Sequence, residues 1–540
     1  MAARVLSGIQ IAEQNGPGHA VMRASTGVTA FVGRTLKGPV NQAVSIASFA
    51  DFQRIFGGLW QPSTLSYAVE QFFDNGGTAA VVVRVANGGR PPTMVLGSGA
   101  SALSLTGLIP GSREHLRASV DHDGIGANET DRFNLVVQRV RGANSELVED
   151  QEIFRRVSVR PESGRYVVDA VAESRMVRVT GPIPSERPGI TPPEEAGGVI
   201  GYVSANNDGD DGAPLTDYDV IGSAQTSTGL FALQGAVQFN LLCIPPLGRD
   251  QDVGASTLLV AARFCRERHA LLVVDPPQAW TDAAQAFDGM RDWPFRADNA
   301  VMYFPRMIAT DRLRGRPEIF ASCGAVAGML ARADAASPLW SPIDHDEVLL
   351  RPGFRAACSV SDAERARLSQ CGINTLSSVR VAHSLNTVAR TLATGNTGAT
   401  DWRYLAPRRL AQFIAQSIEQ GTRWMLFAGN TPETWRRAQM QVLEFLSSLD
   451  DEGAFPGSLP GEGFFAICDG RLNDPAADPQ VMQLLYGYAG ARAGEMHSFL
   501  VTHGGGGSGV RSAAANRYAT SGRRVGEEIE AGLLRGLQDR

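Results

Sequence analysis

The chain has 540 residues, which is too long for one hydrophobic core and predicts two to four domains. Its apolar fraction of 43% is ordinary for a globular protein, and its formal net charge of −6 gives no support to a nucleic-acid partner. No apolar run approaches the ~20 residues that a membrane span needs, and the opening Met-Ala-Ala-Arg lacks the apolar core of a signal peptide. We therefore expect a protein that is made and folded in a cytoplasm, without direct membrane insertion.

Six cysteines stand at positions 243, 265, 323, 358, 371 and 468, and none of them form a CxxC pair. Most sit in apolar segments, as Cys243 does in Leu241–Ile244. Buried free thiols in a reducing compartment are therefore predicted.

The first 22 residues contain one short strand candidate, Gly8-Ile9-Gln10-Ile11-Ala12, followed by a polar turn at Asn15–Gly18. A lone strand cannot bury itself, so it must pair with the edge of a sheet, its own or a neighbour's. The alternative is a frayed terminus. We treat residues 1–22 as an N-terminal arm.

Residues 23–90 predict a compact β-α-α-β module. Val28–Val32 and Ala79–Val85 are continuous apolar runs, which suit strands covered on both faces. Between them, apolar residues recur twice at helical spacing, and Gly57-Gly58 and Asn75–Gly77 end the two helices. This module contains no nucleophile–base pair, so it is predicted to serve packing.

Residues 91–230 predict a mostly β domain inserted after the boundary at Asn87–Pro92. Short apolar runs separated by turn residues indicate its strands. These runs are Phe133–Val137, Val157–Val159, Tyr166–Val168 and Met176–Val179.

Residues 231–490 alternate between strand and helix patterns, which predicts a parallel or mixed sheet with helices on its faces. Expected strands are Asn240–Ile244, Ala270–Asp275, Ala300–Pro305, Trp424–Phe427 and, as the last core strand, Phe464–Asp469. Four helices are expected over residues 254–267, 281–291, 317–332 and 407–420. Two more are expected, one beginning at the capping box Ser361–Glu364 and one beginning at Pro432.

The C-terminal part holds a second isolated strand candidate, residues 495–503, which includes Ser498-Phe499-Leu500-Val501-Thr502. The glycine run 504–509 follows and formally satisfies GxGxxG, but no second strand bearing an acid is expected after it, so we predict a flexible hinge. Residues 491–509 are treated as a C-terminal arm with this hinge. Residues 510–540 form an extension with an amphipathic end around Ile529, Leu533, Leu534 and Leu537.

Several clusters could carry chemistry, and each has a simpler interpretation. Asp275 lies at the carboxyl end of a strand, where α/β enzymes place active residues, but a capped turn is favoured. Asp121–Asp123 and Asp344–Glu347 tolerate metals but are interpreted as solvated loops, and Asn206–Gly212 departs from the calcium-loop pattern. We predict no catalytic, cofactor-binding or metal-binding residues. The basic pairs Arg408-Arg409 and Arg436-Arg437 are either surface charge or contacts with an acidic partner.

Motifs from two halves of the chain point to one family. The first half supplies Thr29–Arg34, Lys37–Pro39, Phe49–Phe52, Phe56–Gly58, Phe72–Gly77 and Val83–Val85. The second supplies Cys371–Asn374, Ala389–Leu392, Trp402–Tyr404, Arg408–Leu410, and Phe427 with Asn430 and Thr434–Arg436. In this order and spacing they resemble tail sheath proteins of contractile phage tails, R-type pyocins and bacterial contractile injection systems, over roughly residues 8–500.

The resemblance implies an α/β (α+β) fold, with a mixed-sheet sheath core, an inserted outer β domain and extended terminal arms. It implies a structural subunit, not an enzyme, that forms stacked hexameric rings around an inner tube. Contraction from a metastable extended state would drive the tube through a target envelope. The strands at Gly8–Ala12 and Ser498–Thr502 would join neighbouring subunits, and Arg408, Arg409, Arg436 and Arg437 are candidates for contacts with the tube or a neighbour.

The resemblance also implies baseplate and tail-terminator or cap proteins as partners. It implies assembly in a bacterial cytoplasm, and a final location in a virion tail or in a released injection particle. No cofactor is implied, and the extension 510–540 has no counterpart in the family. Two other classes remain open: a cytoplasmic α/β enzyme with a site at the strand ends of residues 240–310, and a static coat protein that does not contract.

Overall fold

The computed structural model describes residues 20–143, 145–192, 201–235, 238–341, 349–378, 388–393, 400–455, 463–474, 478–491 and 496–513. The chain divides into two compact units. The first comprises Ser25–Arg266 and Ala270–Thr397, and the second comprises Met1–Ala24, Glu267–His269 and Gly398–Arg540. The predicted mixed α/β class is confirmed, since a largely parallel sheet with helices coexists with smaller antiparallel sheets.

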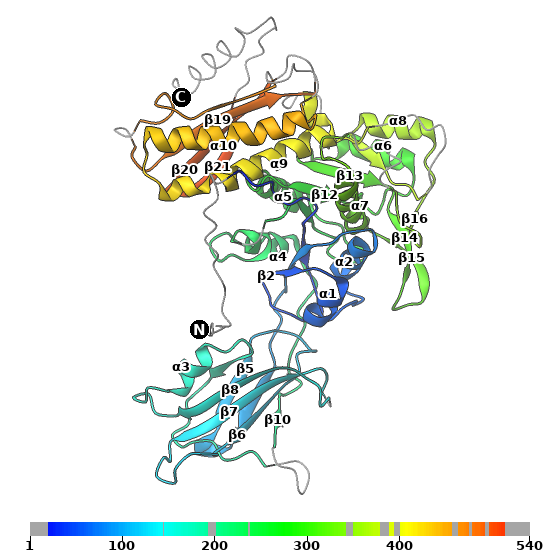
Figure 1. Cartoon of the computed structure of the whole chain (residues 1–540). Helices are drawn as coiled ribbons and strands as arrows, with labels where there is room; N and C mark the ends of the chain where they lie inside the picture. Colours follow the sequence, from blue (N-terminus) through cyan, green and yellow to red (C-terminus); the bar gives the residue numbers. More distant parts are fainter. Residues whose placement is uncertain are drawn as a thin grey trace, which may run out of the picture. The chain divides into compact units, whose positions relative to one another are not determined.

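The first unit is built on a seven-stranded sheet with the strand order β17-β13-β12-β11-β1-β3-β2 (Figure 1). All neighbours are parallel except β2, which runs antiparallel to β3. The central strands are fully buried, as their continuous apolar runs predict. The strands are β1 (Thr29–Gly33), β2 (Ala43–Ile46), β3 (Ala80–Arg84), β11 (Leu241–Cys243), β12 (Leu271–Val274), β13 (Ala300–Phe304) and β17 (Ile373–Thr375).

Helices of the first unit begin and end at the residues that their caps predict. The Ser48 hydroxyl accepts a hydrogen bond from the Asp51 N–H at the start of α1, and Gly57 closes that helix with φ +89°. Ser361 and Glu364 form a capping box at α8. The helices are α1 (Phe49–Phe56), α2 (Thr64–Asp74), α4 (Asp217–Ile221), α5 (Ala255–Glu267), α6 (Ala283–Asp292), α7 (Cys323–Ala336), α8 (Asp362–Gln370) and the 3₁₀ turn η2 (Gly229–Leu233).

The predicted helix over 317–332 is wrong at its start. Residues 316–320 instead form β15 (Arg316–Phe320), which pairs with β14 (Met307–Asp311), and β14 also pairs with β16 (Arg355–Ala356). Only Phe320 of this strand is buried, and Arg316, Pro317 and Ile319 are exposed, so the run lacks the alternation of apolar and polar residues that would have identified a strand.

The inserted region is β-rich, as expected, and has its own core of buried apolar side chains. Two antiparallel sheets have the orders β10-β6-β7-β8 and β4-β5-β9. The strand predicted at Tyr166–Val168 is wrong, because Val167 and Val171 are buried on successive turns of the short helix α3 (Val167–Ala172). The strands are β4 (Thr93–Leu96), β5 (Leu103–Gly107), β6 (Leu116–Asp121), β7 (Arg132–Val140), β8 (Val148–Ser158), β9 (Val177–Thr180) and β10 (Val203–Ser204), with a 3₁₀ turn η1 (Gly99–Ser101).

The second unit packs α9 (Leu405–Gly421) and α10 (Pro432–Asp451) on a four-stranded antiparallel sheet (Figure 1). Its order is β18-β19-β20-β21, with β18 (Phe464–Ile467), β19 (Met482–Ala489), β20 (Met496–Gly504) and β21 (Gly507–Ala513). Both helices confirm their predictions. Two strand predictions are wrong: residues 424–427 lie in the 3₁₀ turn η4 (Arg423–Phe427), and β18 belongs to this separate sheet rather than ending the core sheet. A further 3₁₀ turn, η3, spans Thr400–Arg403.

All six cysteines are free, and Cys243, Cys265, Cys323 and Cys468 are buried, which agrees with the prediction of unpaired thiols. Across the described ranges, no helix has both the length and the apolar character needed to span a bilayer.

Two glycines of α7 allow it to touch α2. An added Cβ on Gly324 would collide with the backbone carbonyl of Ala68, and one on Gly328 would collide with that of Phe72. We expect Gly324→Ala to lower the free energy of unfolding by roughly 3 kcal/mol, because the backbones must separate. Chemical denaturation would measure this, with Ala335→Leu on the exposed side of the same helix as the control. A Gly324→Ala variant as stable as the parent would contradict the close packing.

Candidate interaction surfaces

The sheet β18-β19-β20-β21 contains the strand that was predicted as a C-terminal arm. Ser498–Thr502 lie in β20, which pairs with β19 on one edge and β21 on the other. Phe499, Leu500 and Val501 are buried. This strand is therefore not isolated in the single chain. The other predicted arm strand, Gly8–Ala12, lies outside the described residues.

The glycine run 504–509 forms the turn of the β20–β21 hairpin where a flexible hinge was expected. Gly504 pairs with Gly507, and Gly507 has φ +115°, a conformation that favours glycine. The following strand β21 is antiparallel to β20, so the GxGxxG match does not open a dinucleotide-binding βαβ unit.

The strand β21 is paired along its whole length with β20 but is the most exposed strand of this sheet. Of its seven residues only Ala513 is buried, and Gly507, Gly509, Arg511 and Ser512 are exposed. Within the described residues β21 pairs with β20 alone, and β18 pairs with β19 alone. Both outer strands thus present an edge that can accept another strand.

His503 links the hairpin to the end of α9. The Thr422 hydroxyl donates to the Ile418 carbonyl at 2.6 Å, so it accepts from His503 Nε2 at 2.8 Å. The Nδ1 atom of His503 is then left to accept from the Ser508 hydroxyl at 2.7 Å. Burial, with a smaller effect of nearby Arg423, lowers the pKa of His503 to about 4, so the ring stays neutral near neutral pH.

The two predicted arginine pairs have different surroundings. On α9, Arg409 is buried and Arg408 is half-buried with its guanidinium over the Trp402 ring, 5.2 Å from the ring centroid. On α10, Arg436 and Arg437 are both exposed. The α10 pair is therefore the better placed of the two to meet a partner.

An exposed apolar surface beside Arg436 and Arg437 was missed by the sequence analysis. Phe427 is 91% exposed and Met440 is 61% exposed. Trp424 joins η4 to α10, because its Nε1 donates to Gln441 at 3.0 Å and Arg437 stacks on its ring at 4.6 Å. We call the group Trp424, Leu426, Phe427, Arg436, Arg437 and Met440 the η4–α10 surface.

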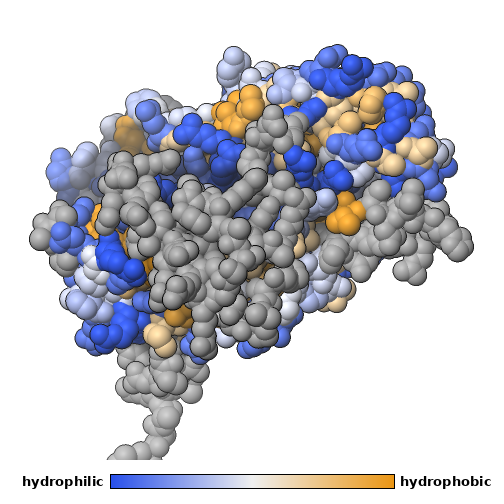
Figure 2. Space-filling view, turned by 90° about the horizontal axis from the view of Figure 1, so that it is seen from above, coloured by the Kyte–Doolittle hydropathy of each residue, from blue (hydrophilic) through white to orange (hydrophobic). Residues whose placement is uncertain are grey.

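Exposed large apolar side chains are unusual enough to indicate a binding surface when they cluster. On the face of the molecule seen in Figure 2, apolar residues form separate patches among hydrophilic ones. The sequence signal for Phe427 was its place in a family-like motif with Asn430 and Trp435. Asn430 and Trp435 have a local role, since Trp435 Nε1 donates to the Asn430 side-chain oxygen at 2.6 Å, whereas Phe427 extends into solvent.

Asp275, at the end of β12, behaves as the capped-turn interpretation predicts. Its Oδ1 atom accepts from the backbone N–H groups of Ser322 and Cys323, both at 2.7 Å, at the start of α7. Burial raises the pKa of Asp275. The adjacent cavity of about 40 Å³ has room for only a few water molecules, which does not favour the alternative of an enzyme site here.

The acidic loop 206–212 uses its carboxylates to hold the inserted domain together. Asp208 accepts from the Thr93 N–H at 2.9 Å and hydroxyl at 2.6 Å, and Asp211 accepts from the corresponding groups of Ser112 at 2.9 and 2.7 Å. Among the described residues there is no group of three side chains suited to a metal. The cluster at Asp344–Glu347 lies outside those residues.

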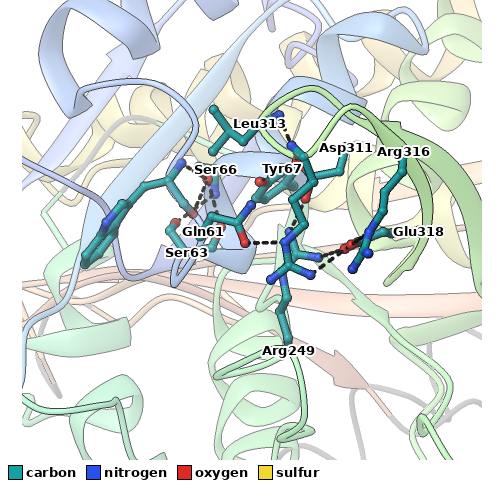
Figure 3. Close-up of polar contacts among 11 residues, drawn as sticks. Gln61, Ser63, Ser66, Tyr67, Arg249, Asp311, Leu313, Arg316 and Glu318 are labelled. Carbon is teal, nitrogen blue, oxygen red and sulfur yellow. Dashed lines mark hydrogen bonds and ion pairs between the residues drawn. The ribbon is translucent and has the colours of Figure 1, made fainter.

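A charged network ties the β14–β15 hairpin to α2 (Figure 3). Buried Asp311 accepts from the Tyr67 hydroxyl at 3.1 Å and from Arg249 at 2.7 Å, and Arg249 also pairs with Glu318. Burial alone would raise the pKa of Asp311, but hydrogen bonds from the Leu313 N–H, Arg249 and Tyr67 hold it below its usual value. The network is satisfied within the chain, so it acts as a structural anchor.

No family model matches the sequence, and no curated protein matches it. The fold, in contrast, matches solved structures. The sheath tail protein of Listeria innocua aligns with a TM-score of 0.59 at 14% identity, over 90% of this chain and 99% of that chain. The chain has the fold of a tail sheath protein.

Two other sheath structures also align, each with a TM-score of 0.49. The sheath tail protein of Desulfitobacterium hafniense is 12% identical, over 92% of this chain and 100% of that one. A subunit of the PVC sheath complex, from an extracellular contractile injection system in its contracted state, is 15% identical, over 92% and 96%. The Listeria alignment is the one that establishes the sheath fold, and it confirms at that level the family suggested by the motifs.

The Asp311 network makes a pH-dependent contribution to stability. Because its folded-state pKa is lowered, ionised Asp311 stabilises the fold above the unfolded-state pKa of about 4, and this stabilisation is lost as the pH falls through the folded-state value. We expect Asp311→Asn to reduce the free energy of unfolding by roughly 3 kcal/mol near neutral pH, and by less in acid. Denaturation at several pH values would measure it, with exposed Asp288→Asn as the control. A pH-independent difference would contradict the assignment.

Proposed function

We propose that this chain is the structural subunit of a contractile tail sheath. Copies would polymerise into stacked, hexameric rings around an inner tube, and would contract from a metastable extended state to drive that tube through a target envelope. The observation that carries the proposal is the sheath fold, which spans 90% of the chain and nearly all of the Listeria innocua sheath tail protein.

The four-stranded sheet of the second unit supports a mechanism for joining the copies. Its outer strands β18 and β21 each have an edge without a strand partner in the described part of the chain. Strand addition at such an edge gains main-chain hydrogen bonds without requiring particular side chains. We propose that the Gly8–Ala12 strand of one copy adds to this sheet in the next copy.

The burial of the C-terminal strands supports a choice between them for exchange. Ser498–Thr502 in β20 are buried and paired on both edges, so removing them would open the centre of the sheet. The edge strand β21 buries one residue of seven and leaves β19 and β20 paired when it departs. We propose β21, rather than β20, as the element exchanged between copies, with β20 as the strand that receives it.

Contacts of one patch with a different patch on the next copy generate helical filaments when they repeat. Exposed Arg436 and Arg437 are candidates for contacts with an acidic partner in that assembly, the inner tube or a neighbouring subunit. Baseplate and terminator proteins would close the two ends of the filament.

The N-terminal strand can be tested with a matched pair of substitutions. Proline has no N–H and a fixed φ, so Ile9→Pro should prevent strand addition, whereas Ile9→Val should preserve it. We expect hollow striated tubes from the parent and Ile9→Val in negative-stain images, and folded single subunits from Ile9→Pro and from a chain lacking residues 1–14.

Long tubes from the chain lacking residues 1–14 would refute the proposal that the N-terminal strand joins the copies. Discrete particles from the parent at high concentration would favour the enzyme alternative, and closed shells would favour a static coat.

A further inference from the structure

The η4–α10 surface leaves apolar side chains in solvent next to two positive charges. Phe427 and Met440 are 91% and 61% exposed, and Leu426 is 36% exposed. The Trp424 ring holds η4 against α10 through Gln441 and Arg437, so the two elements that carry these exposed side chains lie against each other. A partner that suits it would combine an apolar stripe with acidic side chains.

The C-terminal extension carries that combination in its sequence. Val525, Ile529, Leu533 and Leu537 recur every fourth residue, which places them along one face of a helix. Glu527, Glu528 and Glu530 lie among them and supply negative charge. Glycines at 526, 532 and 536 weaken the helix, and so short a segment would be marginal alone in water. The segment therefore needs a surface against which to fold.

The chain can deliver this segment to its own η4–α10 surface. The last described residue, Ala513, pairs with Ser498 on β20, while η4 adjoins the opposite end of β20 through Thr422 and His503. Ser498 and His503 are five residue steps apart on β20, which is roughly 17 Å along a strand. Residues 514–524 can span up to about 36–40 Å when extended, which exceeds that distance about twofold.

We propose that, in the unassembled subunit, residues 525–538 dock as an amphipathic helix on the η4–α10 surface of the same chain. Ile529 and Leu533 cover Phe427 and Met440. Glu530, which borders the apolar stripe, approaches Arg436 and Arg437. The extension thereby shields an apolar surface until the subunit is assembled. This docking involves the single chain and does not depend on sheath formation.

Amide hydrogen exchange of the full chain, at a concentration at which it remains a single subunit, tests the docking directly. We expect the amides of residues 525–538 to exchange roughly tenfold more slowly than those of an unstructured peptide, because a docked helix must open to exchange. Phe427→Asp and Leu533→Asp should both abolish this protection. Neither substitution alters a buried site in the described structure, so both variants should remain folded.

Two matched controls separate a specific contact from a general loss of apolar surface. Leu534 follows Leu533 by ~100° around a helix and lies off the stripe, so Leu534→Asp should retain protection. Tyr218, which is 84% exposed in the other compact unit, serves as the control on the folded body through Tyr218→Asp.

The proposal is overturned if the segment exchanges freely in the parent chain or if Phe427→Asp leaves its protection unchanged. Protection that disappears on dilution would also overturn it, because the segment would then bind a second copy. Protection that remains after dilution and is lost in both Phe427→Asp and Leu533→Asp supports docking within one chain.

Discussion

The pairing of β1 with β11 is the constraint on which the first unit depends. It joins Thr29 to Leu241 and so places the N-terminal β-α-α-β module and the later α/β segment in one sheet. The chain between these strands must leave the sheet and return, and the β-rich domain with its own core occupies that interval. Asn240 reinforces the junction, since its side-chain oxygen accepts from the Val28 N–H at 3.2 Å. Backbone hydrogen bonding between strands that are distant in the sequence therefore holds the first unit together.

The same kind of interaction underlies the proposal for how the second unit joins its neighbours. A sheet of four strands leaves two edges, and here the outer strands are a four-residue β18 and a mostly exposed β21. The central strands β19 and β20 are largely buried and β21 is mostly exposed, which is the basis for proposing β21 as the strand that copies exchange. His503 adds a specific link, since it binds both Thr422 of the body and Ser508 of the exchangeable strand. Asp311, at the end of β14, by contrast has both carboxylate oxygens bonded within the chain, to Tyr67 and Arg249.

Much of the first unit could be predicted because its signals are local. Continuous apolar runs mark β1 and β3, and Ser48 and Gly57 fix the ends of α1. The second unit was harder, because its decisive features are tertiary. The apolar run 424–427 resembles a strand, yet Met425 is buried and Phe427 is exposed in a 3₁₀ turn. The strand β21 has Val510 as its one large apolar residue, so only its pairing with β20 reveals it.

The central claim is that each copy is completed by strands from its neighbours. A cryo-EM reconstruction of the assembled protein, at a resolution that traces the backbone, tests it most directly. The account predicts that the sheet containing β19 and β20 includes strands from other copies, with Gly8–Ala12 of one neighbour among them. A filament in which every such sheet is built from a single chain, with copies touching only through side chains, would contradict it.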